Sequence, residues 1–347
     1  SNGDVLLSQT LINRIFEAYK SPQIDILVND DTLRVAKVLS NVKYIHQFSY
    51  SDKKNSRWKQ EKKLIIKLFK KYDLSINLTA SDRSVLYSLL AGKKSISAVE
   101  IQNKKSWWKK ILLSNYYIFN SEKHILSNNL EPLKILNIKY TLVQDLPTIS
   151  SKAIDKMYKK LSEEGINNFI IFHPSAQYIY KVYPAKLRNN LLTLFSKSNI
   201  VVIVTGGNND IDSDINLNFP LLKNIYNWIG KTSIEEYIAL SYLSKAYVGM
   251  DTLNMHIAAA QNKRIFAIFG PTKLSMWSPW SNKLESSATI NLPLQTYENV
   301  TIFQADMPCV ACGNAGCKDS GKSECLNKIE PYVIFSQVEK WQQNNEL

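Results

Sequence analysis

Residues 247–272, YVGMDTLNMHIAAAQNKRIFAIFGPT, place an acid, a hydroxyl and a histidine close together at Asp251, Thr252 and His256. YVG is typical of a buried strand end and the alanines favour a helix, so this seam is predicted at a helix N-terminus. Backbone N–H groups and the helix dipole attract an anion there. Thr252 can donate to a phosphate, whereas ionised Asp251 only accepts and suits sugar hydroxyls. Simple helix capping, with His256 structural, explains these residues equally well.

Two other predicted strand ends carry groups that suit a phosphorylated ligand. In FHPSAQYIYK (172–181), Ser175 supplies a hydroxyl and Lys181 a cation for a diphosphate. In VTGGNND (204–210), a glycine turn precedes Asp210, a candidate ribose ligand, although the spacing is not that of a dinucleotide loop. Three such loops in one domain indicate a nucleotide-type ligand.

The elements that must position these loops alternate between apolar strands and amphipathic helices. Predicted strands cover 24–29, 73–79, 168–174, 199–207, 247–251 and 263–270, and predicted helices cover 5–20, 58–72, 82–92, 151–165, 233–246 and 331–343. This alternation indicates an α/β fold with parallel sheets, in which ligands bind at the carboxyl ends of the strands.

The segment KYTLVQDLPTISS (139–151) is interpreted as a linker, with Pro147 near the boundary. The predicted organisation is therefore one domain at 1–147, a second at 148–330, and a C-terminal helix within 331–347. The opening SNGDVLL is interpreted as a loop that leads into a helix. Because a doubly wound domain usually opens with a strand, a first strand is expected before Ser1.

Composition favours an anionic partner. Lys plus Arg total 43 against 30 Asp plus Glu, which gives a net charge of +13 in 347 residues. Nucleic acid, an acidic membrane surface and a phosphorylated substrate all fit that charge. No membrane-spanning run or signal peptide is predicted, and the few, clustered cysteines favour a cytoplasmic protein.

The segment NKKSWWKKILLSNYYIF (103–119) mixes lysines with aromatic residues. Such a segment could enter a membrane interface or contact an acidic acceptor, and an ordinary domain surface is an equal alternative. The residues concerned are Lys104, Lys105, Trp107, Trp108, Lys109 and Lys110. A second basic stretch, with lysines at 62, 63, 67, 70 and 71, is interpreted as a solvated helix face.

The four cysteines follow a C-x2-C-x4-C-x7-C pattern at Cys309, Cys312, Cys317 and Cys325. Four thiols this close can hold a structural zinc ion. Such an ion would not be catalytic, because four thiolate ligands leave no open coordination position. The alternative is four reduced or partly disulfide-linked cysteines.

Beyond these local patterns, nearly the whole chain resembles glycosyltransferase family nine, the ADP-heptose:lipopolysaccharide heptosyltransferases of GT-B fold. GDVLLSQTL (3–11) is similar to the N-terminal Gly-Asp loop of the family, and YDLSINLTASDRSVLYSLLAG (72–92) to its next segment. HPSAQYIYK, IGKTSIEEYIAL, MDTLNMHIAAA and FGPT follow in family order. SINLTASDR and the clustered cysteines resemble the heptosyltransferase I/III branch.

The resemblance implies two Rossmann-like domains that face each other across a cleft, the first for the acceptor and the second for the donor. It implies inverting, metal-independent transfer of L-glycero-D-manno-heptose from ADP-heptose to Kdo or heptose of the lipopolysaccharide core. The enzyme would be peripheral on the cytoplasmic face of the inner membrane of a Gram-negative bacterium, with no nucleic acid partner.

The resemblance also assigns roles to individual residues. Asp4 would be the general base, although it could instead cap its helix. The diphosphate ligands would be Ser175, Lys181, Thr252 and backbone groups near Leu253, Asn254 and Met255, with Asp251 and His256 on the heptose. Leu253 stands where the family usually has glycine, and Ala176 replaces a frequent hydroxyl residue. The alternatives are a GT-B transferase with another nucleotide sugar, a transferase relative that has lost activity, and a basic nucleic-acid-binding protein.

Overall fold

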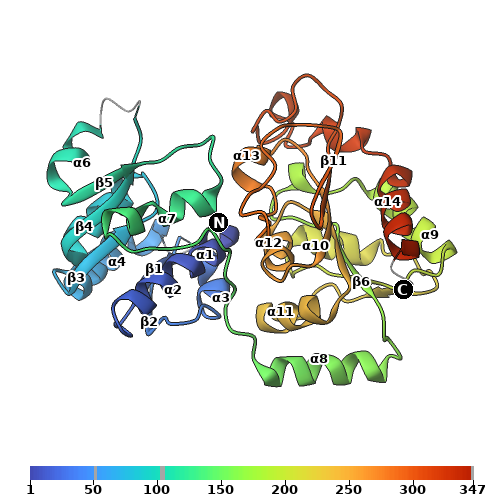
Figure 1. The fold of residues 1–347 in the computed structure, drawn as a ribbon, viewed down its shortest axis with the longest axis horizontal. Helices are drawn as coiled ribbons and strands as arrows, with labels where there is room; N and C mark the ends of the chain where they lie inside the picture. Colours follow the sequence, from blue (N-terminus) through green and yellow to red (C-terminus); the bar gives the residue numbers. More distant parts are fainter. Residues whose placement is uncertain (51–52, 102–105, 345–347) are drawn as a thin grey trace. The chain divides into compact units, whose positions relative to one another are not determined.

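The computed structural model describes residues 1–50, 53–101 and 106–344. The chain divides into two compact units, Ser1–Pro147 and Thr148–Leu347 (Figure 1). Both units alternate helices with strands in parallel sheets, so the predicted α/β class is confirmed. None of the helices in the described ranges is both long enough and apolar enough to cross a membrane.

The first unit contains two small parallel sheets. β1 (Asp25–Asn29) pairs with β2 (Tyr44–Phe48), and β4 (Gly92–Val99) lies between β3 (Tyr72–Asn77) and β5 (Asn115–Ile118). The helices are α1 (Asn2–Leu7), α2 (Gln9–Ala18), α3 (Leu33–Ala36), α4 (Lys53–Leu68), α5 (Asp82–Ala91), α6 (Trp107–Leu112) and α7 (Ile125–Ile135).

Side chains link the two sheets of this unit. The Tyr72 hydroxyl donates to Asp25 Oδ2 at 2.7 Å and lies 2.7 Å from His46 Nε2. Burial lowers the pKa of His46, an effect that the neighbouring Lys67 reinforces and Asp25 partly opposes. These hydrogen bonds connect β1, β2 and β3, whereas His46 Nδ1 has no hydrogen-bond partner among the described residues.

The start of the chain differs from the prediction. Residues Asn2–Leu7 form a helix rather than a loop, and the helix predicted over 5–20 is broken at Ser8 into α1 and α2. The Ser8 hydroxyl donates to the Val5 carbonyl oxygen at 2.7 Å. Serine side chains compete in this way for backbone groups that would otherwise continue the helix.

The second unit is built on one seven-stranded sheet with the order β11-β12-β10-β9-β6-β7-β8. Only the β11–β12 pair is antiparallel among these strands. The strands are β6 (Ile170–His173), β7 (Val202–Val204), β8 (Ile225–Asn227), β9 (Ala246–Met250), β10 (Arg264–Ile268), β11 (Leu294–Tyr297) and β12 (Val300–Phe303). The helices are α8 (Ser151–Glu163), α9 (Ala185–Lys197), α10 (Asp210–Leu217), α11 (Ile234–Leu243), α12 (Leu253–Ala260), α13 (Leu274–Trp277) and α14 (Pro331–Asn344).

Helices cover both faces of this sheet (Figure 1). On one face α9 contacts α14, and Phe195 and Phe335 join the core formed with strand residues such as Phe172. On the other face α11 contacts both α8 and α12. Because two covered faces leave no side of the central strands in water, β6 and β9 are buried along their whole length. The C-terminal helix α14 is therefore part of the second unit.

The direction of strand addition reverses between β6 and β9. The chain runs outward from β6 to β7 and β8, and then returns to the other side of β6 as β9 and β10. Such a switch point leaves a crevice at the carboxyl ends of the two central strands, where ligands of open α/β sheets bind. The residues that follow β6 and β9 are therefore the candidates for a ligand site.

Candidate functional site

The loops after β6 and β9 meet in an ion pair. Lys181 ends a short 3-10 helix (Ile179–Lys181), Asp251 directly follows β9, and Lys181 Nζ lies 2.8 Å from Asp251 Oδ2. Burial alone lowers the pKa of Lys181, but attraction to Asp251 and the hydrogen bond outweigh it and raise that pKa. Because the Lys181 side chain is still 25% exposed, this fixed cation can also reach a bound anion.

The N-terminus of α12 lacks a side-chain cap within the described part of the chain. Thr252 occupies the cap position without a capping hydrogen bond, so the capping interpretation of Thr252 is wrong. The N–H groups of Met255 and His256 donate to the Thr252 carbonyl. The first-turn donors that face outward from the helix are therefore those of Leu253 and Asn254.

Leu253 and Met255 thus differ in what they can offer a ligand. Leu253 has a negative, helical φ, so leucine can present the backbone N–H that glycine usually supplies in the family. Met255 has a fully buried side chain, and its N–H already bonds to Thr252. The prediction that Met255 contributes a backbone group to the diphosphate is not supported.

His173, a histidine without a predicted role, joins the two loops. His173 ends β6, and its Nδ1 lies 2.9 Å from Asn254 Nδ2 and 3.0 Å from Thr205 Oγ1. Because the Asn254 amide nitrogen can only donate, Nδ1 accepts from it and the proton of the neutral ring is on Nε2. Burial lowers the pKa of His173 to about 4, with a smaller opposing effect from negative Asp212. The only sequence signal that could have identified His173 as a site residue is its place as a polar residue at the end of the apolar run NFIIFHP.

Gly249 allows β6 and β9 to end close together. A Cβ at Gly249 would lie 2.5 Å from the His173 carbonyl oxygen and 2.8 Å from the Tyr247 hydroxyl. That hydroxyl donates to the Met250 carbonyl at 2.8 Å and lies 3.5 Å from Thr252 Oγ1. A larger residue at this position would therefore displace the strand end that carries the site.

The glycine turn after β7 accommodates a buried acid. Asp212, for which no role was predicted, is buried, and its Oδ1 has no hydrogen-bond partner among the described residues. A Cβ at Gly206 would lie 2.6 Å from that oxygen, so the glycine makes room for the carboxylate. Asp210, the predicted ribose ligand, begins α10 and is exposed.

Two further predicted ligands are buried. Ser175 follows β6, and His256 lies in the first turn of α12. The His256 ring centroid is 6.4 Å from the ring of Trp277 in α13. The sequence did not indicate Trp277, because its place depends on how the segment after FGPT folds back.

Asp4, the predicted general base, lies in the first turn of α1 in the first unit. Its Oδ2 accepts a hydrogen bond from the Ser1 nitrogen at 2.6 Å. This contact supports the start of the helix, as the capping alternative requires. The side chain is 42% exposed, so the carboxylate is also accessible to a ligand.

The basic and aromatic segment around α6 is only partly a surface. Lys104 and Lys105 lie outside the described residues, and Trp107 and Lys110 are exposed. Trp108 packs against Val85, Val99 and Leu113.

Lys109 contradicts the prediction for this segment. Its side chain is buried, Nζ donates to the Ala80 carbonyl at 2.5 Å, and Nζ lies 2.6 Å from Asp82 Oδ1. The assignment of Lys109 to an acceptor or membrane surface is wrong, because the cation is used inside the first unit.

The cysteines differ in exposure: Cys309 and Cys312 are exposed, Cys317 is half-buried and Cys325 is buried. Burial raises the pKa of Cys325 to about 11, with smaller contributions from the other three cysteines. Within the described ranges, no group of three or more His, Cys, Asp or Glu side chains is arranged to hold a metal ion. The geometry therefore gives no support to the structural zinc, which stays a prediction.

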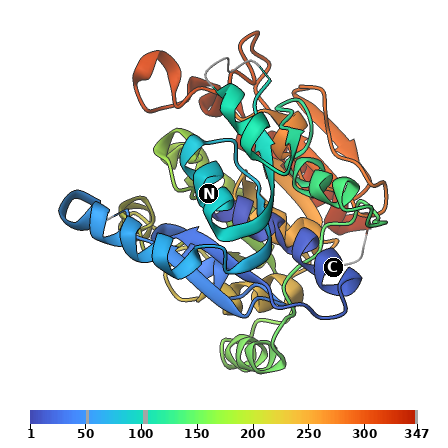
Figure 2. The same cartoon turned by 90° about the vertical axis from the view of Figure 1, so that its left-hand side faces the viewer.

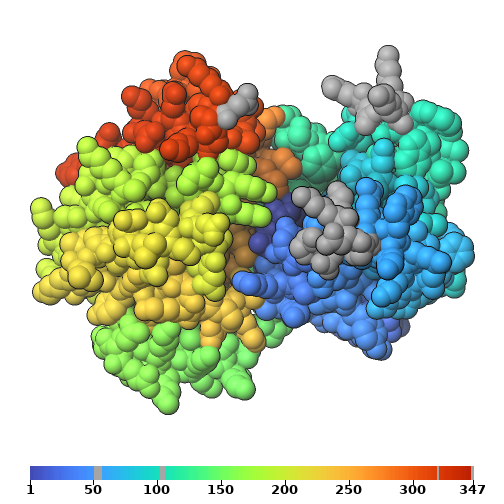
Figure 3. Space-filling view, turned by 180° about the vertical axis from the view of Figure 1, so that it is seen from behind, coloured from blue at the N-terminus to red at the C-terminus, as the bar shows by residue number. Residues whose placement is uncertain are grey.

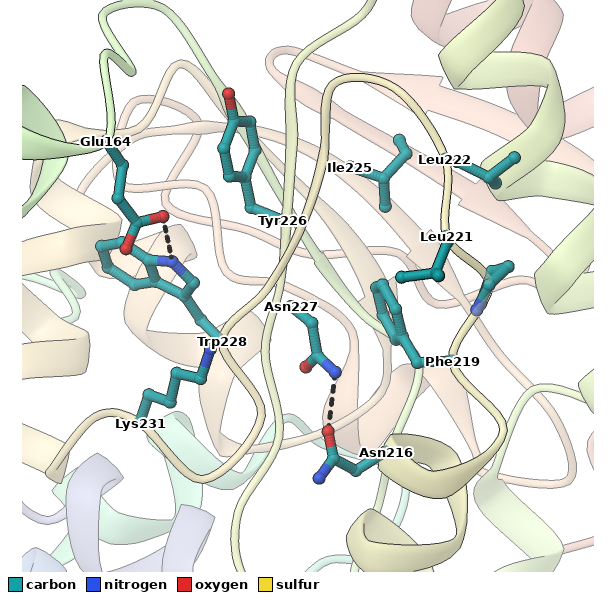
Figure 4. A pocket seen from close by; sticks show the side chains of 11 residues that line it. Glu164, Asn216, Phe219, Leu221, Leu222, Ile225, Tyr226, Asn227, Trp228 and Lys231 are labelled. Carbon is teal, nitrogen blue, oxygen red and sulfur yellow. Dashed lines mark hydrogen bonds between the residues drawn. The ribbon is translucent and has the colours of Figure 1, made fainter.

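A separate pocket of about 660 Å³ runs beside the edge strand β8 (Figure 4). In it the Trp228 Nε1 donates to Glu164 Oε2 at 3.0 Å, and Asn227 Nδ2 donates to Asn216 Oδ1 at 2.6 Å. None of the predicted ligands lines this pocket.

Comparison with known proteins gives concordant results. The model of the family described as glycosyltransferase family 9 (heptosyltransferase) matches residues 62–305. Lipopolysaccharide heptosyltransferase 3 of Escherichia coli is 25% identical over 298 residues, which cover 82% of this chain and 85% of that protein. Among solved structures, E. coli ADP-heptose LPS heptosyltransferase II aligns with a TM-score of 0.70 at 17% identity, covering 100% of this chain and 97% of that one. E. coli heptosyltransferase WaaC with ADP aligns with a TM-score of 0.71 at 14% identity, covering 98% and 97%.

Proposed function

Because the chain belongs to glycosyltransferase family 9, the heptosyltransferase family, we propose that it transfers L-glycero-D-manno-heptose from ADP-heptose to the inner core of lipopolysaccharide. The family resemblance and the GT-B fold predicted from the sequence are confirmed, and the chain is a glycosyltransferase. The donor, the acceptor and the roles of individual residues are parts of this proposal.

The observation that carries the donor assignment is the cation beside an uncapped helix at the switch point. Lys181 lies in the loop after β6, and the N-terminus of α12 directly follows Asp251 and Thr252. The ion pair between Lys181 and Asp251 brings the two together. A diphosphate there would gain the Lys181 charge and the N–H groups of Leu253 and Asn254. Asp251 has one oxygen on Lys181, which leaves the other to accept from a sugar hydroxyl.

In the proposed reaction the acceptor hydroxyl oxygen forms a bond to the anomeric carbon of the heptose. The bond from that carbon to the β-phosphate oxygen breaks, ADP leaves with the electron pair, and the configuration inverts. Asp4 takes the acceptor proton as a general base. Such catalysis typically raises the rate by about 10²–10⁴-fold. Lys181 and the α12 N-terminus offset the charge that develops on ADP, so no metal is needed.

The acceptor we propose is Kdo or heptose of the lipid A-linked core. An acceptor of this kind is anchored in a membrane, so the enzyme would work as a peripheral protein on the cytoplasmic face of the inner membrane of a Gram-negative bacterium. The net charge of +13 supports an anionic acceptor and surface.

A screen of ADP-, UDP- and GDP-sugars against defined core acceptors tests the proposal. ADP-heptose should be the donor that supports turnover, and a chelator should leave the rate unchanged. A preference for another nucleotide sugar would favour the alternative GT-B transferase, for which Leu253 and Ala176 are the motivating residues. Salt-sensitive DNA binding without nucleotide-sugar binding would favour the nucleic-acid alternative.

A further inference from the structure

The outward face of α4 carries large apolar side chains that no described residue covers. Trp58 is 86% exposed, Ile66 69%, and Phe69, just after the helix, 59%. At about 100° per residue, the three fall within roughly 80° of the helix circumference, which makes one stripe. The opposite face of α4 is also apolar and is already used, because Leu64 and Leu68 pack into the core of the first unit.

Exposed lysines lie beside this stripe. Lys59, Lys62, Lys63 and Lys67 are exposed, and none of them forms an ion pair with a described residue. Lys62 falls between Trp58 and Ile66 on the helix circumference, and the other three lie to one side. The outward face of α4 therefore combines an apolar stripe with lysines that no acid among the described residues neutralises.

Two lysines of the predicted solvated face behave differently. Lys70 Nζ donates to the carbonyls of Leu89 and Gly92 at 3.1 and 2.8 Å. Lys71 Nζ lies 3.3 Å from Asp25 Oδ2. All five lysines of that group are exposed, as a solvated face requires, but Lys70 and Lys71 follow the end of α4 and are also engaged within the first unit.

We propose that the α4 stripe (Trp58, Ile66 and Phe69) and its flanking lysines form the docking surface of this enzyme for an anionic phospholipid bilayer. A helix that lies in a membrane interface needs an apolar strip with an aromatic residue at headgroup depth and lysines whose heads reach anionic lipid. α4 supplies both on a face that the fold leaves outside (Figures 2 and 3).

Two other occupants fit this face less well. A nucleic acid would neutralise the lysines, but Ile66 has no partner on a phosphate backbone, whereas a bilayer accepts both. A second copy of the chain would bury the apolar stripe but would bring two rows of lysines together, and like charges across an interface repel. The bilayer is the occupant that satisfies both halves of the face.

The bilayer as partner rests in part on the lipid-linked acceptor of the proposed function. The test can nevertheless be separated from catalysis, because vesicles that contain neither donor nor acceptor report binding alone. Failure of the parent protein to bind vesicles, while it still transfers to a soluble core oligosaccharide, would contradict only the docking surface. Retained vesicle binding without transfer would contradict only the proposed activity.

The experiment is co-sedimentation of the full chain with vesicles of phosphatidylcholine alone and of phosphatidylcholine mixed with phosphatidylglycerol. We expect binding to the mixed vesicles only. Trp58→Ser with Phe69→Ser should lower the partition coefficient at least about tenfold, and each of Lys59→Gln and Lys63→Gln about fivefold. Because these side chains are exposed, circular dichroism and ADP binding should match the parent.

The matched control uses Tyr158→Ser with Leu217→Ser, two exposed apolar residues of α8 and α10. These changes should leave vesicle binding within about twofold of the parent. Equal losses from the α4 variants and the control variant would overturn α4 as the docking surface, as would parent-like binding by the α4 variants. The bilayer assignment would also be overturned if the parent bound duplex DNA and Trp58→Ser with Phe69→Ser abolished that binding. The same holds if the parent formed dimers that these changes dissociate.

Discussion

Lowering the pH from 7 to 5 should destabilise the second unit through His173. The pKa of this buried histidine is about 4 in the folded protein, below the 6.5 of a free imidazole. As the pH falls through 6.5, the unfolded chain binds a proton that the folded chain does not. The stability that neutral His173 contributes is therefore complete above pH 6.5 and is lost progressively between pH 6.5 and 4.

The size of this loss follows from the two pKa values. At pH 5 it is about 2 kcal/mol, and below pH 4 it levels off at about 3 kcal/mol. No discount for solvent screening applies, because the His173 side chain is buried. A loss of this size is large against the typical total stability of a domain.

The assay is urea unfolding of the parent and of His173→Gln from pH 7 to pH 5. Glutamine can accept from Asn254 but does not titrate, so the gap in unfolding free energy between the two proteins should change by about 2 kcal/mol. Other titrating groups cancel in this difference. The transition of the second unit is identified by its shift with ADP.

His46→Gln provides the matched control, because the pKa of His46 is also lowered but the residue lies in the first unit. This change should leave the pH dependence of the ADP-sensitive transition as it is in the parent. If the difference in unfolding free energy between the parent and His173→Gln stays constant from pH 7 to pH 5, the conclusion that His173 is buried and neutral is refuted. The folded protein protonates His173, and removes the acceptor of Asn254, only near pH 4, so ADP affinity should hold from pH 7 to pH 5 and fall as the pH approaches 4 in the parent only.

Three predictions concern the other candidate residues. Asp4→Ala should lower transfer by about 10²–10⁴-fold with ADP binding nearly unchanged, and unaltered turnover would remove Asp4 from its role. Lys181→Ala should weaken ADP and ADP-heptose together by about 10- to 100-fold in calorimetric titrations, and equal affinities in variant and parent would contradict the diphosphate assignment. Lys181→Ala leaves the buried Asp251 carboxylate without its cation, which also lowers stability. The double variant Lys181→Ala with Asp251→Asn removes that unpaired charge and therefore separates lost binding from lost stability. Metal analysis of protein purified without chelator should find stoichiometric zinc that Cys325→Ser removes, and metal-free parent protein would end the zinc prediction.

Local patterns in the sequence were sufficient for the fold class and for the candidate loops. Apolar strands alternating with amphipathic helices indicated parallel sheets, and a parallel sheet places every carboxyl end at one edge. Asp251, Thr252 and Lys181 were therefore predicted as site residues from their places after strands. The break at Ser8 was missed, because a serine side chain bonding its own backbone leaves no mark on hydrophobic periodicity.

Long-range partners were decided by the tertiary structure. Lys181 and Asp251 are 70 residues apart, and His173 and Asn254 are 81 apart. Each pair meets because β9 returns beside β6, and nothing in either local segment specifies that neighbour. For the same reason, the sequence did not show that Lys109 is buried or which face of α4 is exposed. Periodicity tells which residues of a helix are apolar or charged, whereas only the packed chain determines which face of α4 is covered and which cation finds an acid inside.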